Sequence, residues 1–204
     1  NWCGIGVAVA DSPYGPFKDA LGKQLLTNAQ CPGTTHSWAC IDPVVYQDEE
    51  GNAWLYWGNG KCYVAKLKPN MIEIDGEVKE ITPEGSSFTE APWVHKHNGK
   101  YYLTFAQGWP EKLGYAVGDS PMGPFNRIGR ILQQDPEVAK GAGHHSVIQV
   151  PGKDEYYIVY HRRPLDKTGG SERQVCIDKL EFDEEGFIKP VKMTFEGVAP
   201  VTIK

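Results

Sequence analysis

The chain has 204 residues, a net charge of −5 and 40% hydrophobic residues, which suffices for one substantial core or two small ones. Charges of both signs are scattered without a basic stripe, and no apolar run approaches the ~18 residues of a membrane helix, so neither nucleic acid nor a membrane is expected as a partner. The five cysteines lack CxxC spacing, which argues against zinc and leaves at least one thiol unpaired unless it bonds another chain. The sequence begins at Asn1 without a signal peptide, so secreted and cytoplasmic locations both stay open.

The chain repeats itself at two scales. The segment VAVADSPYGPF at 7–17 returns as YAVGDSPMGPF at 115–125. Between these copies, the segment that Asp42 opens aligns without a gap with the one around Glu90, because the two acids and two turn glycines are each 48 positions apart. A third copy, GHHSVIQVPGKDEYYIVYH, starts near Gly143. Such self-similarity indicates a repeated structural unit.

The repeated segments are rich in aromatic and β-branched residues, which favour strands. In chain order the predicted strands are Ala53–Trp57, Cys62–Leu67, Tyr101–Phe105, Lys112–Val117, Tyr156–Tyr160 and Gln174–Leu180. Turn signals at 49–52, 97–100 and 151–154 precede three of them, and connections such as DSPYGPF forbid regular structure. A single helical turn is the interpretation for Pro136–Lys140.

Units of about 50 residues with three or four short strands each are typical of propeller blades. We therefore expect an all-β, partial β-propeller domain over 1–204, with units at about 1–35, 36–86, 87–138 and 139–204, or roughly three and a half to four blades. The innermost strand of a blade lies nearest the central axis. Asp42, Glu90 and either His144 or His145 head successive innermost strands, so these side chains should converge on one site.

Two converging carboxylates are the minimum apparatus for glycoside hydrolysis. Glu90 is the candidate acid, because its apolar neighbours, Phe88 to Trp93, and the charge of Asp42 should raise its pKa. Asp42 would stay ionised, to activate water or to hold up the pKa of Glu90. The alternative interpretation is that each acid caps a strand end or pairs with an arginine.

Other residues suit a sugar site. Trp38, Trp57, Trp93 and Trp109 lie near the acids or on the same strands, and sugar rings stack on indoles, although Trp57 also suits the core. The histidine pair at 144–145 could bind a cation or simply form hydrogen bonds. Arg173 opens a late strand, where its guanidinium could orient a carboxylate or a sugar hydroxyl, or pair on the surface.

Together these residues resemble glycoside hydrolase family 43, in its β-xylosidase and α-L-arabinofuranosidase branch. The matching stretches cover essentially the whole chain: GVAVADSPYGPFKD, CIDPVVYQDEEGNAWLYWGN, SSFTEAPWVHKHNGKYYLTFA, GHHSVIQVPGKDEYYIVYHRR and ERQVCIDKLEFDEEGFI. The resemblance implies a five-bladed propeller and an inverting mechanism. It also implies that Glu90 is the general acid, that Asp42 modulates its pKa, that His144 contacts a central calcium ion (Ca²⁺), and that Arg173 holds the acidic cluster. We assign Arg173, Trp38, Trp93 and His145 to substrate binding.

One departure from the family concerns the general base, an aspartate on the first blade. This chain opens inside what resembles the second blade, and Asp11 and Asp19 do not match the base. We therefore expect the base outside this chain, which would be N-terminally incomplete, with a second polypeptide or an oligomer as one way to complete the propeller. The expected activity is hydrolysis of terminal β-xylosyl or α-L-arabinofuranosyl residues from xylan or arabinoxylan oligosaccharides. The alternatives are a catalytically incomplete sugar-binding propeller and a scaffold for protein partners.

Overall fold

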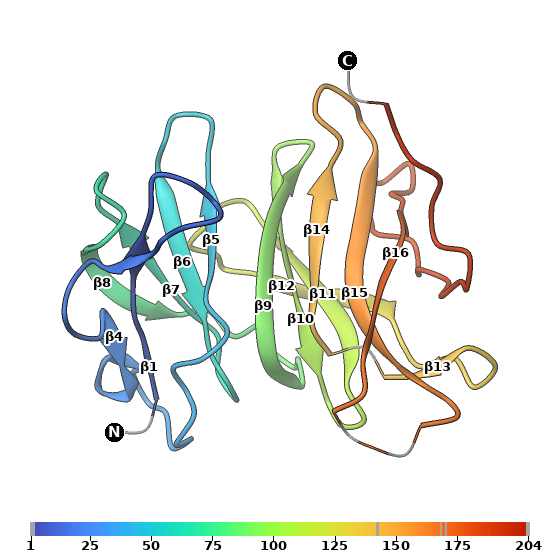
Figure 1. Cartoon of the computed structure of the whole chain (residues 1–204), viewed down its shortest axis with the longest axis horizontal. Coiled ribbons are helices and arrows are strands. Elements are labelled where there is room, and N and C mark those ends of the chain that lie inside the picture. Colours follow the sequence, from blue (N-terminus) through green and yellow to red (C-terminus); the bar gives the residue numbers. More distant parts are fainter. Residues whose placement is uncertain (1–2, 142, 168, 170, 203–204) are drawn as a thin grey trace.

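The computed structural model describes residues 3–141, 143–167, 169 and 171–202, and these form antiparallel β-structure nearly throughout (Figure 1). Four short strands come first: β1 (Gly4–Ile5), β2 (Ala8–Val9), β3 (Lys18–Asp19) and β4 (Leu26–Thr27). In the described part of the chain, helical structure is confined to one 3₁₀ turn, Asn28–Gln30. The all-β prediction is confirmed, and within the same residues no helix has the length and apolar character to cross a membrane.

Three four-stranded units follow. The first contains β5 (Val44–Gln47), β6 (Ala53–Trp57), β7 (Tyr63–Leu67) and β8 (Ile74–Glu80). The second contains β9 (Phe88–His97), β10 (Lys100–Gln107), β11 (Lys112–Gly118) and β12 (Asn126–Leu132). The third contains β13 (Ala139–Lys140), β14 (His145–Gln149), β15 (Tyr156–Pro164) and β16 (Gln174–Leu180).

All six predicted strands are present, two of them with the predicted bounds. The helical turn predicted for Pro136–Lys140 is confirmed in part. The amides of Val138 and Ala139 donate to the carbonyl of Asp135, which closes one turn, but the chain then continues as β13 and not as a helix.

The first two units are meanders, with the spatial orders β5-β6-β7-β8 and β9-β10-β11-β12. In the third, β15 pairs with β14, β13 and β16. Strand β9 contacts both β5 and β14, so these three strands, one from each unit, lie side by side, as the inner strands of adjacent blades do (Figure 1). We call β5, β9 and β14 the leading strands. The heads of these three strands therefore lie together on one side of the molecule (Figure 1).

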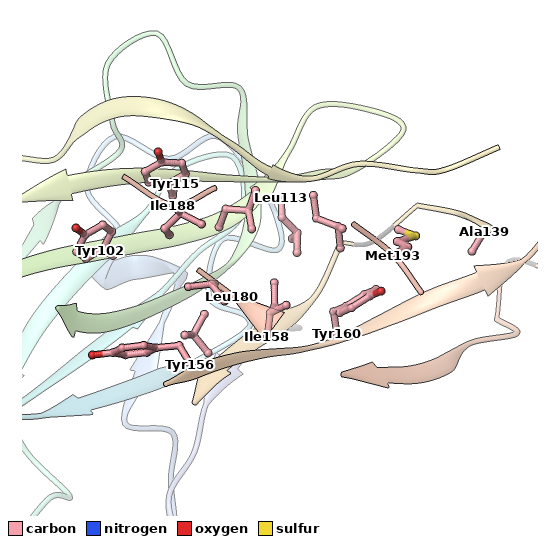
Figure 2. Close-up of a cluster of buried hydrophobic side chains, with 13 residues drawn as sticks. Tyr102, Leu113, Tyr115, Ala139, Tyr156, Ile158, Tyr160, Leu180, Ile188 and Met193 are labelled. Carbon is pink, nitrogen blue, oxygen red and sulfur yellow. The ribbon is translucent and has the colours of Figure 1, made fainter. Parts of the chain in front are cut away.

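The cores lie between adjacent sheets. One cluster joins the second and third units and includes Tyr102, Leu113 and Ile158 (Figure 2). Another joins the first and second units and includes Tyr56 and Leu103. Neighbours Tyr102 and Leu103 belong to different clusters because side chains alternate across a strand, so the β9–β12 sheet is covered on both faces.

A β-bulge in β9 sets the direction of the acid-bearing segment. Thr104 pairs with Trp93, but Ala106 pairs with Glu90, so β9 has one more residue in this interval than β10. Pro92 lies in the bulge, and Ala91 has a positive φ of 54°, as does Asp42 in the preceding unit. Bulges and strained non-glycine residues often occur where a side chain is re-aimed at a functional site.

Candidate active site

Three side chains from three units meet at the heads of the leading strands. Asp42 precedes β5, Glu90 lies in β9 and His144 precedes β14, and one polar atom of each lies within 4.8 Å of the others. The Nε2 atom of His144 is 2.9 Å from Oε1 of Glu90 and 3.8 Å from Oδ2 of Asp42. The predicted convergence of the two acids is confirmed, and His144 is the histidine that joins them.

The turn between β6 and β7 supports both acids. Asn59 donates from Nδ2 to Oε2 of Glu90 over 2.8 Å, so hydrogen bonds hold both oxygens of this carboxylate. The amide of Gly58 donates to Ile41, beside Asp42, and the amide of Gly60 donates to Thr89, beside Glu90. This turn therefore fixes the spacing of the two acid-bearing segments. The sequence analysis missed Asn59, for which the only signal is the turn sequence WGNG after a strand.

Glu111 is a further acid at the site that the sequence analysis missed. It lies between β10 and β11, is 7% exposed, and its carboxyl group interacts with that of Glu90. Burial and the charge of Glu90 raise the pKa of Glu111, so it is more readily protonated than a free glutamate. Its carboxyl group occupies the space where Gly143 lacks a side chain, since a Cβ there would be 2.0 Å from Oε2 of Glu111.

The charge states of the acids differ from the prediction. The hydrogen bond from His144 lowers the pKa of Glu90, so the predicted rise is wrong for this structure. The apolar neighbours do oppose the charge through burial, but the imidazole of the next unit outweighs them. Burial raises the pKa of Asp42 instead, with a further contribution from the charge of Glu90. The carboxylate of Glu90 raises the pKa of His144, so the pair favours an imidazolium next to a carboxylate.

The tryptophans fall into two groups. Trp38 is 61% exposed and lines a pocket of about 510 Å³ together with Asp42, so it is placed to stack on a ligand. Trp109 is also exposed. Trp57 is fully buried, as the core interpretation held. Trp93 is half-buried and packs against the core cluster that contains Tyr102, and its indole Nε1 has no partner among the described residues.

His145 and Arg173 do not contact the acids directly. Nε2 of His145 lies 2.5 Å from Oγ1 of Thr104, and burial lowers the pKa of His145 to about 3, so this imidazole is neutral. Arg173 is exposed just before β16, where its charge contributes to lowering the pKa of His161. The ring of His161 is 5.9 Å from that of His144, which places Arg173 at the edge of the site.

Asp42, Glu90 and His144 are the residues of the described chain that could together hold a cation. Their arrangement fits calcium poorly. Ca²⁺ takes six to eight oxygen ligands, whereas this group offers two carboxylates and an imidazole whose Nε2 is already hydrogen-bonded to one of them. The buried Oδ2 of Asp42 has no hydrogen-bond partner among the described residues, and a water or a sugar hydroxyl could fill this place as well as a cation.

Replacing His144 with Gln should destabilise the chain most between about pH 4.5 and 6.5. The raised pKa of His144 gives a stabilisation that is complete below 6.5 and disappears as the pH rises through the folded-state value. The lowered pKa of Glu90 gives a second stabilisation, which is present above pH 4.5 and is lost as the pH falls below it. Because His144 is 45% exposed, we expect a loss of only ~0.5–1 kcal/mol. Urea unfolding at pH 5.5 and 8.5 measures it, and an equal loss at both values would contradict the ion pair.

Paired carboxylates at the heads of adjacent leading strands, with an exposed indole beside them, are the apparatus of a glycoside hydrolase. Comparison with known proteins gives the family. The chain belongs to the glycosyl hydrolases family 43, whose sequence model matches residues 1–188.

Three curated relatives illustrate the similarity. The chain is 41% identical over 208 residues to the β-D-galactofuranosidase xynD of Aspergillus niger, covering 98% of this chain and 59% of the relative. It is 34% identical to an arabinoxylan arabinofuranohydrolase of Paenibacillus polymyxa, over 98% of this chain and 35% of the relative. It is 31% identical to a β-xylosidase of Xylanibacter ruminicola, over 92% of this chain and 66% of the relative. The chain thus spans between about a third and two thirds of the length of these relatives.

Solved structures show the same fold. A family 43 arabinoxylan arabinofuranohydrolase from Bacillus subtilis, in complex with cellotetraose, superimposes with a TM-score of 0.85 at 32% identity, over 98% of this chain and 46% of that one. An α-L-arabinofuranosidase from Clostridium thermocellum gives a TM-score of 0.78 at 36% identity, over 94% and 66%.

Proposed function

We propose that this chain carries the acid-bearing part of a glycosidase that releases terminal β-xylosyl or α-L-arabinofuranosyl residues from xylan or arabinoxylan oligosaccharides. The observation that carries the proposal is the cluster of Asp42, Glu90 and His144 within 4.8 Å. The names of the relatives, which include arabinoxylan arabinofuranohydrolases and a β-xylosidase, support the substrate class.

Glu90 is the proposed general acid, although in the absence of ligand its pKa is lowered. His144 supplies the missing proton, because its Nε2 lies 2.9 Å from Oε1 of Glu90. A sugar bound over the half-buried pair would displace water, and loss of water disfavours two adjacent charges relative to the neutral acid and neutral imidazole. The proton would then reside on Glu90, ready for the leaving oxygen.

Asp42 is proposed to orient the sugar and to modulate the pKa of Glu90. The unpartnered, buried Oδ2 of Asp42 supports a hydrogen bond to a substrate hydroxyl. Trp38 is the proposed stacking platform, since it lines the same pocket. Arg173, Trp93 and His145 remain proposed substrate contacts, and of these Arg173 is the most exposed.

We further propose an inverting mechanism, a five-bladed propeller and a general base outside residues 1–204, on this or a second polypeptide. An inverting enzyme needs its two carboxyl groups about 6.5–9.5 Å apart, so that water fits between base and sugar. Glu111 does not meet this need, because its carboxyl group interacts directly with that of Glu90 and leaves no room for water and sugar between the two. A calcium ion beside His144 stays a prediction.

The isolated 204-residue chain should turn over aryl xylosides and arabinofuranosides far more slowly than a longer form that includes the base. A positioned base contributes ~10²–10⁴-fold, so we expect at least that loss, with partial rescue by azide. Initial rates on nitrophenyl β-xyloside and α-L-arabinofuranoside measure it. Equal rates for the two forms would show that another carboxylate of this chain acts as the base.

The same assay tests the substrate class when nitrophenyl β-galactofuranoside is added, because the relative at 41% identity is named a β-D-galactofuranosidase. Higher kcat/KM for either pentoside supports the proposal, whereas a preference for the galactofuranoside would replace it. The alternative, a sugar-binding propeller without catalysis, predicts that pentose oligosaccharides bind while the longer form also fails to turn over.

A further inference from the structure

Three of the five cysteines gather in the core next to the acids. Cys3, Cys31 and Cys40 all belong to the cluster that packs around Trp57, and each is at most 9% exposed. Cys31 and Cys40 are neighbours within this cluster, since the thiol of each affects the pKa of the other. Cys62 and Cys176 belong to other parts of the fold, with Cys62 fully buried between the first and second units.

Asn28 holds the two neighbouring cysteines in place. Its backbone carbonyl accepts from the amide of Cys31 over 3.1 Å, and its side-chain Oδ1 accepts from the amide of Cys40 over 3.0 Å. Its Nδ2 also donates to the carbonyl of Ser37 over 2.6 Å. The segment from 31 to 40 is therefore a loop whose two ends are tied at one residue.

The surroundings give the two thiols different reactivity. The thiol of Cys40 lowers the pKa of Cys31 to about 7, and the indole N–H of Trp57, which donates to Sγ of Cys31 over 3.3 Å, contributes to this shift. The thiol of Cys40 keeps its proton, because its neighbour raises its pKa. Cys3 takes another role, since its Sγ donates to the carbonyl of Cys40 over 3.0 Å. Cys31 is thus the nucleophile of the group.

We propose that Cys31 and Cys40 form a disulfide when the chain meets a disulfide oxidant such as oxidised glutathione. The thiolate of Cys31 attacks one glutathione sulfur, forming a mixed disulfide and releasing one glutathione thiolate. Cys40 then loses its proton and attacks the sulfur of Cys31, releasing the second glutathione thiolate. Two electrons pass from the cysteine pair to the oxidant, and the two thiol protons end on the two glutathione molecules.

The bond would close a loop that projects to the surface. Between the two cysteines most residues are exposed, including His36 and Trp38, so brief opening of this loop gives the oxidant access. Trp38 lines the pocket next to Asp42, and the disulfide would restrict the segment that carries it. Any effect on sugar affinity rests on the proposed function, but formation of the bond does not.

The test refolds the reduced 204-residue chain in a glutathione redox buffer and counts free thiols with Ellman's reagent in denaturant. We expect three free thiols, a mass loss of 2 Da and a non-reducing peptide map that links Cys31 to Cys40. Cys31→Ser and Cys40→Ser should each leave four free thiols and no loss of mass. Cys62→Ser and Cys176→Ser are the matched controls, and each should still form the bond.

Five free thiols after refolding, or a map that links Cys3 to Cys40, would overturn the proposal. A second measurement reports on the loop itself. Amide hydrogen exchange of residues 33–38 should slow at least ~10-fold on oxidation of the wild-type chain and not in Cys31→Ser, because the crosslink removes loop openings. Unchanged exchange in a chain shown to carry the bond would overturn the claim that it restrains Trp38.

Discussion

Replacing Glu90 with Gln should lower kcat/KM on pentose oligosaccharides by ~10²–10⁴-fold in the longest active form of the protein. Gln keeps the volume and the hydrogen bond from Asn59, which donates to this side chain, but it cannot supply a proton. The loss should shrink on dinitrophenyl glycosides, because their leaving group departs without protonation. Steady-state kinetics on the two leaving groups measures both effects.

The matched control for this variant is Glu80→Gln. Glu80 is a half-exposed glutamate in β8 that pairs with Lys61 on the surface, so its replacement should leave kcat/KM unchanged. If Glu90→Gln lost the same factor on both leaving groups, Glu90 would not be the proton donor. If it lost nothing, Asp42 or Glu111 would have to act instead.

Gly143→Ala should destabilise the chain by about 1–3 kcal/mol, the usual cost of overpacking a buried site. The new methyl group would lie 2.0 Å from Oε2 of Glu111, and this buried carboxyl group can move aside only by changing its place beside Glu90. Urea unfolding measures the loss, and a matched fall in sugar affinity should accompany it.

Two comparisons separate this clash from a general effect of alanine. Gly6→Ala is the control, because a Cβ there meets nothing within 4 Å, and its cost should stay within ~0.5 kcal/mol. In a Glu111→Ala background, Gly143→Ala should cost much less, since the two residues are in contact. Equal costs in both backgrounds would mean that Glu111 is not what requires a glycine at 143.

The repeat register predicted the main geometry of the site. Asp42 and Glu90 occupy equivalent positions 48 residues apart, and strands that start adjacent sheets of one fold must bring such positions together. The same register predicted the strands, because aromatic and β-branched runs after turn signals have few other ways to be buried. The choice between His144 and His145 needed the structure: β14 begins at His145, which turns the neighbouring residue toward Glu90.

What the sequence could not show are contacts between units. The pKa of Glu90 was predicted from its own segment and from Asp42, but the deciding group, His144, is 54 residues away. Asn59 and Glu111 lie on turns of two different units and match no motif, so only the assembled sheets reveal that both reach Glu90. The local sequence indicates whether a side chain has apolar neighbours, whereas the charge state of an acid also depends on partners that folding brings together.

The most direct measurement of the central claim is a crystal structure of the Glu90→Gln chain with a xylan or arabinoxylan oligosaccharide. The account predicts the terminal pentose between Asp42 and Trp38, with its glycosidic oxygen within hydrogen-bond distance of the side chain at 90. An oligosaccharide bound elsewhere, with the cluster of Asp42, His144 and the side chain at 90 left in contact with solvent, would contradict it.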